Sequence, residues 1–213
     1  MSFFDLKMVE FLDKVDSAAP TPGGGTVSAA AIAFGIGLLR MVGNLNVSKK
    51  KFRELPDTVR EDFQGRLGEL ASLKQEAIAL ADLDSAAFEK IMNAYRLGKE
   101  TEEERRKREE AILLSTKEAT EIPLATARLG LKALETALPM LSHAVKSAFS
   151  DFGVGTLLLA AGIKGAVLNV KTNLVGFSDA GFKEACLEEC ERIVVSAEKM
   201  TSEIQDLLNK AFN

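Results

Sequence analysis

Three polar side chains share one face of a helix predicted over residues 151 to 175. At about 100° per residue, Asp151, Asn169 and Asn173 fall within a sector of about 60°. The sector also contains Gly155, Gly162 and Ala166, whereas Lys164 and Lys171 lie nearly opposite. Because a lysine face marks solvent and buried polar groups need partners, we interpret the polar face as one wall of a site. Asp151 is its first candidate catalytic group. The alternative is close helix packing, with Asp151 as a helix cap and both Asn side chains bonded to backbone.

A second carboxylate lies on an apolar helical stripe. Asp84, Phe88, Ile91 and Tyr95 step by 4, 3 and 4 residues, which directs Asp84 inward. Aspartate is rarely buried unless it is paired or functional, so Asp84 is the second candidate catalytic residue. The alternative is that Asp84 caps the helix predicted to begin near Leu83.

A glycine-rich turn could supply backbone amides to a ligand. The segment Pro20-Thr-Pro-Gly-Gly-Gly-Thr26 leads directly into an apolar helix. Converging amides of Gly23, Gly24 and Gly25, together with a helix N-terminus, suit an anion or a carbonyl group. No Gly-Lys-Ser/Thr follows, so the segment is not a P-loop. The alternative is a tight connection between two helices.

The sequence holds no clear motif for a metal site or for a catalytic nucleophile. The chain has one histidine, His143, and its two cysteines, Cys186 and Cys190, follow a helical period. These residues cannot assemble a zinc site, and no nucleophile-elbow sequence supports a catalytic triad, so we predict catalysis without a metal. The cysteines are expected to be buried packing residues.

The three consecutive lysines Lys49 to Lys51 form a basic cluster. The cluster either binds an acidic ligand or is solvated surface.

Helical periodicity dominates the chain, so the predicted fold is all-α: a single-domain bundle of long antiparallel helices over residues 1–213. A heptad seam predicts that the last helix packs along a neighbour; it consists of Cys186, Cys190, Ile193, Ala197, Met200, Ile204 and Leu207. Pro123 should kink or divide the helix that begins after the capping box Thr101 to Glu104. The predicted helices cover about residues 4–15, 26–46, 56–80, 83–97, 101 onward, 151–175 and 179–211.

Charge and composition exclude several partners. The net charge is −4, which argues against nucleic acid as a partner. The apolar runs 27–39 and 152–163 are shorter than the ~20 residues that cross a bilayer, so no membrane interaction is expected. Two cysteines and no signal-peptide pattern favour the cytoplasm.

Several motifs resemble those of the cyclodeaminase family, meaning the C-terminal domain of formiminotransferase-cyclodeaminase and its stand-alone bacterial relatives. They occur along the chain in the same order as in that family. The motifs are Phe11-Leu-Asp-Lys with Pro20-Thr-Pro-Gly-Gly-Gly-Thr26, Lys49-Lys-Lys-Phe52, Asp84-Ser-Ala-Ala-Phe88, Ala94-Tyr-Arg-Leu-Gly-Lys-Glu-Thr101, Ile122-Pro-Leu, Ser150-Asp-Phe-Gly-Val154 and Gly165-Ala-Val-Leu-Asn-Val-Lys-Thr-Asn173. The residues 142–149 depart from the family pattern.

The resemblance implies a homodimeric lyase that converts 5-formiminotetrahydrofolate to 5,10-methenyltetrahydrofolate and ammonia. It implies no cofactor beyond the tetrahydrofolate substrate, with a separate formiminotransferase as a possible partner. Asp151 and Asp84 would be catalytic, Asn169 and Asn173 would hold the pterin edge, and Gly23 to Gly25 would offer amides. Lys49 or Lys50 would meet glutamate carboxylates, while Tyr95 and Arg96 belong to the expected binding surface. Two alternatives remain: a methenyltetrahydrofolate cyclohydrolase, or a non-catalytic helical folate-binding or oligomerisation module.

Overall fold

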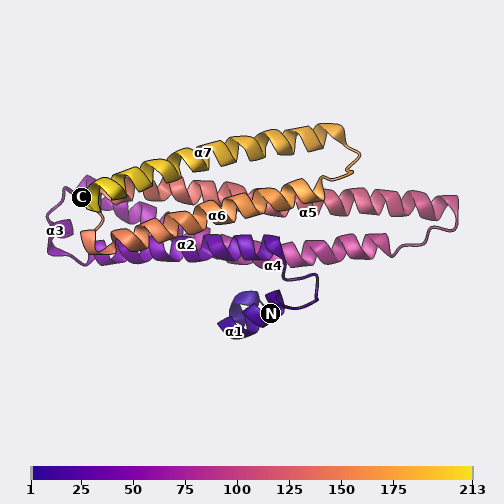
Figure 1. Cartoon of the computed structure of the whole chain (residues 1–213), viewed down its shortest axis with the longest axis horizontal. Helices are drawn as coiled ribbons and strands as arrows, with labels where there is room; N and C mark the ends of the chain where they lie inside the picture. Colours follow the sequence, from indigo (N-terminus) through magenta and orange to yellow (C-terminus); the bar gives the residue numbers. More distant parts are fainter. Residues whose placement is uncertain (1, 213) are drawn as a thin grey trace.

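Long helices run side by side along one axis in the computed structural model, which describes residues 2–212 and the side chains of residues 2–211 (Figure 1). After the 3-10 turn η1 (Phe3–Asp5), the elements are α1 (Met8–Val15), α2 (Gly24–Val47), α3 (Lys50–Arg53), α4 (Asp57–Tyr95), α5 (Glu102–Ala137), the 3-10 turns η2 (Leu138–His143) and η3 (Lys146–Ala148), α6 (Phe149–Asn173) and α7 (Ala180–Phe212). No strand occurs among the described residues, and the predicted all-α class is confirmed.

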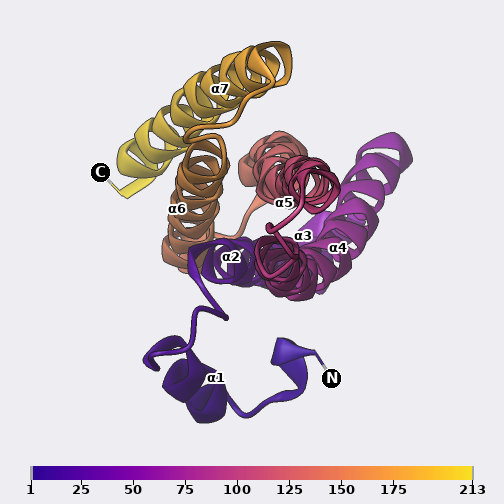
Figure 2. The same ribbon diagram turned by 90° about the vertical axis from the view of Figure 1, so that its right-hand side faces the viewer.

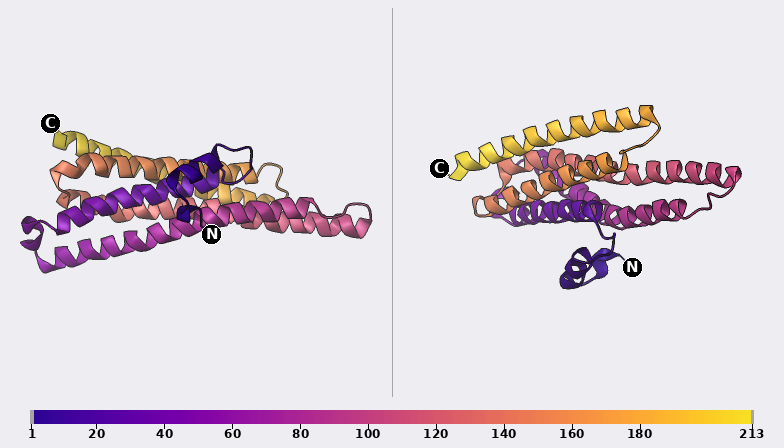
Figure 3. Two further views of the ribbon diagram at one scale, coloured as in Figure 1. Left: turned by 90° about the horizontal axis from the view of Figure 1, so that it is seen from below. Right: turned by 45° about the vertical axis from the view of Figure 1, so that its right-hand side comes forward.

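The core is the space between α2, α4, α5 and α6. Viewed along the bundle, these four helices surround a common centre, and α7 lies outside them against α5 and α6 (Figure 2). Fully buried aliphatic side chains fill the centre, among them Ile32, Ile36, Leu70, Leu134 and Ile163. The short α1 stands off the bundle next to the start of α2 (Figure 3). None of its residues is buried.

Helices α2 and α6 approach closely because glycines face each other. A Cβ on Gly35 would lie 2.7 Å from the carbonyl oxygen of Gly155, and one on Gly162 would lie 2.7 Å from that of Ser28. The small residues of the predicted polar face therefore serve close helix packing, since any larger side chain would push the two helices apart.

Two helix boundaries differ from prediction. The helices expected over residues 56–80 and 83–97 form the single element α4, because no glycine or proline separates them and the apolar stripe continues. Pro123 does not divide its helix, and α5 runs unbroken from Glu102 to Ala137. The capping box is confirmed: Glu104 N–H donates to Thr101 Oγ1, and Thr101 N–H donates to the Glu104 carboxylate.

The last helix packs through most of the predicted seam. Cys186, Cys190, Ile193, Ala197 and Ile204 are buried, and both cysteines are free thiols. Leu207, expected in the seam, is exposed, and Leu208 is buried instead. This shift follows from the 3.6-residue period of a straight helix, which drifts away from a strict heptad.

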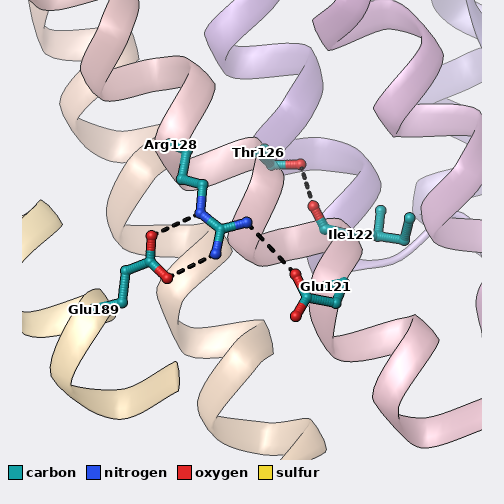
Figure 4. A network of polar contacts seen from close by, with 5 residues as sticks. All are labelled: Glu121, Ile122, Thr126, Arg128 and Glu189. Atoms are coloured by element: carbon teal, nitrogen blue, oxygen red, sulfur yellow. Dashed lines mark hydrogen bonds and ion pairs between the residues drawn. The ribbon is translucent and has the colours of Figure 1, made fainter. Parts of the chain in front are cut away.

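An ion-pair network joins α7 to α5 on the outer surface. Arg128 donates from Nε and Nη2 to the two carboxylate oxygens of Glu189, at 2.7 and 2.6 Å, and its Nη1 lies 3.5 Å from Glu121 (Figure 4). This fork geometry fixes the rotation of α7 about its axis. The guanidinium lowers the pKa of the Glu189 carboxyl below its ordinary value.

Two helices are long and apolar enough to cross a membrane by length and composition alone, Gly24–Val47 and the segment Lys146–Asn173. Each is longer than the apolar run predicted within it. In the fold the two segments pack against each other, and 61% of the most apolar window of the first and 44% of that of the second are buried.

Candidate functional site

Asp84 contacts the N-terminus of α2. Thr26 Oγ1 donates to Asp84 Oδ2 at 3.0 Å and lies 3.2 Å from the Ser85 hydroxyl. A Cβ at Gly25 would overlap the Asp84 carboxylate, so only glycine leaves room for the carboxylate at this position. The glycine-rich turn and the inward-facing carboxylate, predicted separately, are thus in contact.

The role of Asp84 as a cap of its own helix is excluded, because Asp84 lies well inside α4. Its carboxylate serves the first turn of α2 instead. Burial raises the Asp84 pKa above its ordinary value, and hydrogen bonds from the Thr26 side chain and backbone oppose part of that rise. A carboxyl group with a raised pKa is suited to carry a proton.

Asn169 borders the same turn from α6. A Cβ at Gly24 would lie 3.2 Å from Asn169 Nδ2, which donates to the carbonyl oxygen of Gly165 at 2.8 Å. Asn169 is half-buried. Gly24 and Gly25 therefore lie against Asn169 and Asp84, two other predicted site residues that are remote from the turn in sequence.

Asn173 holds the helix α5 where Pro123 interrupts its hydrogen bonds. Proline has no N–H, so Pro123 leaves the carbonyl of Ala119, four residues earlier, without its helical donor. Asn173 Nδ2 donates to that carbonyl at 2.9 Å. This contact accounts for an unbroken α5, and because Nδ2 is engaged, the side-chain oxygen of Asn173 remains as an acceptor.

A pocket of about 540 Å³ lies beyond the N-terminus of α2, where α4 and α5 continue past the end of α6 (Figure 1). Phe88 and Asn173, which line it, are each one helical turn beyond Asp84 and Asn169. Other lining residues are Ile91, Tyr95, Glu109, Ile112, Leu113, Thr116, Thr172, Val175, Gly176, Phe177 and Ser178. The pocket is mostly apolar and aromatic with a few polar groups, which is typical of a small-molecule site.

Tyr95 and Arg96 differ in their positions. Tyr95 lines the pocket, and the Arg108 guanidinium lies 5.4 Å from the centre of its ring. Arg96 follows the end of α4, is exposed and donates to Asn93 Oδ1 at 3.2 Å. Arg96 is not among the residues that line the pocket.

The remaining predicted residues lie at the other end of the bundle. Asp151 is in the first turn of α6, 18 residues before Asn169, which corresponds to about 27 Å along the helix. Lys49 and Lys50 follow the C-terminus of α2, the opposite end from Gly24. Within one chain, neither Asp151 nor these lysines meet Asp84. The predicted sector of Asp151, Asn169 and Asn173 does face the interior, and Lys164 and Lys171 are exposed on the opposite side. A sector gives only the angle around the helix axis, however, and not the distance between residues along it.

Sequence reasoning missed Thr26 and Ser85, the hydroxyl partners of Asp84. It also missed Phe177 and the α5 residues that form the far wall of the pocket. Thr26 follows Gly25 and Ser85 follows Asp84 in the sequence. Their hydroxyl groups, next to two predicted site residues, were the one sequence feature that could have indicated this contact. Nothing local to α5 indicates that it faces Asn173.

Comparisons with known proteins agree on one family. The family model described as formiminotransferase-cyclodeaminase matches residues 7–192. The chain is 34% identical over 203 residues to a methenyltetrahydrofolate cyclohydrolase of Methylorubrum extorquens, covering 95% of this chain and 96% of the relative. It is 33% identical over 201 residues to the formimidoyltransferase-cyclodeaminase of Gallus gallus, of which it spans 36%.

A solved structure shares the whole fold. The crystal structure of a formiminotetrahydrofolate cyclodeaminase from Thermotoga maritima superposes with a TM-score of 0.85 and 26% sequence identity, covering 98% of each chain. Its similarity extends along the entire helical arrangement described above. The chain belongs to the formiminotransferase-cyclodeaminase family.

Proposed function

We propose that this chain is an enzyme that acts on the one-carbon unit between N5 and N10 of a tetrahydrofolate derivative. The observation that carries the proposal is the Asp84 carboxyl, with its raised pKa, one helical turn from an aromatic-lined pocket of about 540 Å³. The ring system of a folate requires such an apolar, aromatic slot, and the bridge chemistry requires a proton carrier next to it.

The first candidate reaction is cyclodeamination of 5-formiminotetrahydrofolate. N10 attacks the formimino carbon, N10 loses its proton, and the former imine nitrogen gains protons and leaves as ammonia. The product is the 5,10-methenyl cation. When it is protonated, the Asp84 carboxyl donates a proton to the leaving nitrogen, and the carboxylate that results stabilises the cation. A rigid pocket that holds N10 against the carbon lowers the entropic part of the barrier.

The second candidate reaction is hydrolysis of 5,10-methenyltetrahydrofolate. A specific observation favours it: the cyclohydrolase of Methylorubrum extorquens matches this chain over nearly its full length. In this reaction water attacks the methenyl carbon and Asp84 accepts its proton, after which the ring opens to the formyl product. The two reactions place the same group at the same carbon, so residue types do not separate them.

The Asn side chains have an assigned direction in this proposal. Asn169 Nδ2 and Asn173 Nδ2 each donate to a backbone carbonyl, so in this proposal their side-chain oxygens are the groups that accept from the ligand. The N–H groups at the edge of a pterin are such donors. Amides of the Gly23 to Gly25 turn then face the substrate from the other side of Asp84.

One assay decides between the reactions. The purified chain is offered 5-formiminotetrahydrofolate and 5,10-methenyltetrahydrofolate separately, and ammonia release and methenyl absorbance are followed. Ammonia release from the first substrate indicates the cyclodeaminase, and loss of methenyl absorbance above the uncatalysed rate indicates the cyclohydrolase. Absence of both contradicts the proposal and favours a non-catalytic module.

We also propose that the chain is a homodimer. An apolar stripe on α2 steps by 4, 3, 4, 3 and 4 residues on its outer side; it consists of Val27, Ala31, Phe34, Leu38, Met41 and Leu45. Val27, Phe34, Met41 and Leu45 are exposed, as are Val154, Leu157 and Leu168 on the neighbouring α6. A heptad stripe of this length is suited to a second copy.

The dimer also provides a reason for the distant site residues. If two copies of α2 pack antiparallel, Lys49, Lys50 and Asp151 of one chain approach the Gly24 end of the other. In that arrangement the lysines meet the glutamate carboxylates of the substrate. Sedimentation at micromolar protein tests the dimer, and a monomer would contradict it.

A further inference from the structure

One short loop forms a wall of the pocket next to Phe88. The loop joins α6 to α7 (Figure 1), and all of its residues 175–178 line the pocket. Val175 is 81% exposed although it borders this mostly apolar pocket. Gly176 has a φ of +70°, a left-handed conformation that favours glycine and reverses the chain here. The loop therefore presents to the pocket apolar surface that a bound ring would cover.

The two ends of the loop are held in different ways. At the end of α6, Leu174 is only 1% exposed, and its N–H donates to the carbonyl oxygen of Val170 at 3.1 Å. At the start of α7, Asp179 Oδ1 accepts from the N–H of Phe182 at 3.0 Å, and its Oδ2 accepts from Lys117 Nζ at 2.7 Å. The ammonium lowers the pKa of the Asp179 carboxyl below its ordinary value, so the pair is ionised at neutral pH. The second end is thus tied to another helix, α5, by a charged contact.

Lys117 contacts the same region in a second way. Its Nζ lies 5.2 Å from the centre of the Phe182 ring, within the range of a cation–π interaction. The Phe182 ring lies 5.6 Å from the ring of Phe177, which lines the pocket. Lys117 also follows Thr116, which lines the pocket from α5. One lysine therefore links the wall formed by α5 to the wall formed by the loop.

We propose that Lys117 is a positioning residue for this pocket. Through Asp179 and Phe182 it holds the loop between α6 and α7 in place. In that position Val175 and Phe177 close the pocket over a bound ring system. The identity of that ring system, a folate, rests on the proposed function.

The effect of Lys117 on a ligand is indirect, because Lys117 is not one of the described residues that line the pocket. When its contacts are lost, the loop occupies other positions for part of the time. The apparent affinity then falls by the fraction of molecules in which the loop is in place. Groups that act on the reacting carbon keep their positions, so the rate at saturating substrate should change little.

The first test compares Lys117→Met with Lys164→Met. Methionine keeps an unbranched apolar side chain and removes the ammonium. Lys117→Met should raise KM about fivefold at a nearly unchanged kcat, since a partly exposed charged pair is lost. Lys164→Met is the matched control, because Lys164 Nζ pairs with Glu198 on α7 at 2.7 Å, away from the pocket, and KM should stay as in the wild type. A fall in kcat at unchanged KM, or an equal rise in KM for the control, overturns the inference.

A double variant tests whether Lys117 acts through Asp179. Asp179→Asn keeps an oxygen that accepts from the Phe182 N–H but removes the negative charge. It should raise KM as Lys117→Met does, and the double variant Lys117→Met/Asp179→Asn should have a KM close to that of either single variant. Effects on KM that multiply would contradict the proposed route.

Chymotrypsin cleavage after Phe177, located by fragment mass, reports the position of the loop without turnover. Lys117→Met should be cut there about fivefold faster than the wild type and Lys164→Met, because the open loop is more populated. Folic acid, which has the ring system of the proposed substrate but no one-carbon bridge, should slow this cleavage in the wild type. Equal cleavage of all three proteins overturns the inference. Faster cleavage of Lys117→Met alone, without turnover and without protection by folic acid, leaves the hold on the loop established and contradicts the proposed function instead.

Discussion

The amide of Asn173 replaces a hydrogen bond that α5 cannot make for itself. Its Nδ2 donates to the carbonyl of Ala119 at 2.9 Å, and Ala119 is the residue whose helical donor would be the missing N–H of Pro123. Ala119 is buried, so water is not an easy substitute. A proline in one helix and an asparagine at the end of another thus form one structural unit that also borders the candidate pocket.

A double-mutant cycle tests this unit. Asn173→Ala should cost about 1–3 kcal/mol, because it leaves a buried carbonyl unpaired. In a Pro123→Ala background the backbone N–H returns and the same substitution should cost at least about 1 kcal/mol less. Urea unfolding of the four proteins measures the difference. Additive costs would show that Asn173 acts on something other than the Ala119 carbonyl.

Gly25→Ala should remove activity without removing the fold. The new Cβ overlaps the Asp84 carboxylate, so Asp84 must leave its contact with Thr26. We expect kcat to fall by about 100-fold or more, the scale of a displaced acid–base group. Gly37→Ala is the matched control in the same helix: its Cβ meets nothing within 4 Å, and it should stabilise the chain by about 0.5–1 kcal/mol.

The two candidate carboxylates can be separated by their amide variants. Asp84→Asn keeps the shape and an acceptor for Thr26 but cannot carry a proton, so kcat should fall by about 100-fold or more. Asp151→Asn changes a half-buried residue remote from the pocket in the same chain. If Asp151 serves only the first turn of α6, its variant should retain most turnover and lose at most about 1 kcal/mol of stability. A similar fall in kcat for both variants would place Asp151 at the reacting carbon, from a second chain.

Ionisation of the Asp84 carboxyl should lower the free energy of unfolding as the pH rises. Its pKa is raised in the folded state, so its contribution is fully present below the unfolded pKa of about 4 and is lost as pH rises through the folded pKa. Asp84→Asn has no such loss. The melting temperature of the variant relative to the wild type should therefore increase between pH 4 and pH 7. A constant difference across this range would contradict the raised pKa.

Arg128→Met should loosen α7. The substitution breaks the forked contact with Glu189, and a partly exposed bidentate pair contributes about 1 kcal/mol. Because the Glu189 pKa is lowered in the folded state, this contribution is present above the unfolded pKa and is lost as pH falls through the folded pKa. Thermal unfolding at neutral and acid pH measures both effects.

The control for Arg128 is Lys90→Met, which breaks the more exposed pair with Glu118 and should change stability by less than about 0.5 kcal/mol. High salt should reduce the difference between wild type and Arg128→Met. An Arg128 variant as stable as the Lys90 variant would show that the fork does not hold α7.

Local sequence determined the elements of this protein. The spacing of apolar residues predicts the long helices, with α4 divided in two, the capping box sets the start of α5, and the glycine-rich turn sets the start of α2. The stripe with Phe88 and Tyr95 also determines that Asp84 faces inward. These features depend on residues a few positions apart, and backbone geometry alone links them.

Only the tertiary structure decided which of these groups meet. Asp84 lies 58 residues from Thr26 and Asn173 lies 54 residues from Ala119, and neither pairing has a local signature. The same is true of the continuity of α5, since Pro123 is tolerated only because another helix supplies a donor. Asp151 and Asn169 share one helical face but lie about 27 Å apart along the axis. Periodicity in the sequence determines only the angle of a residue around its helix axis. The packing of neighbouring helices determines which residues of other helices it meets at its position along that axis.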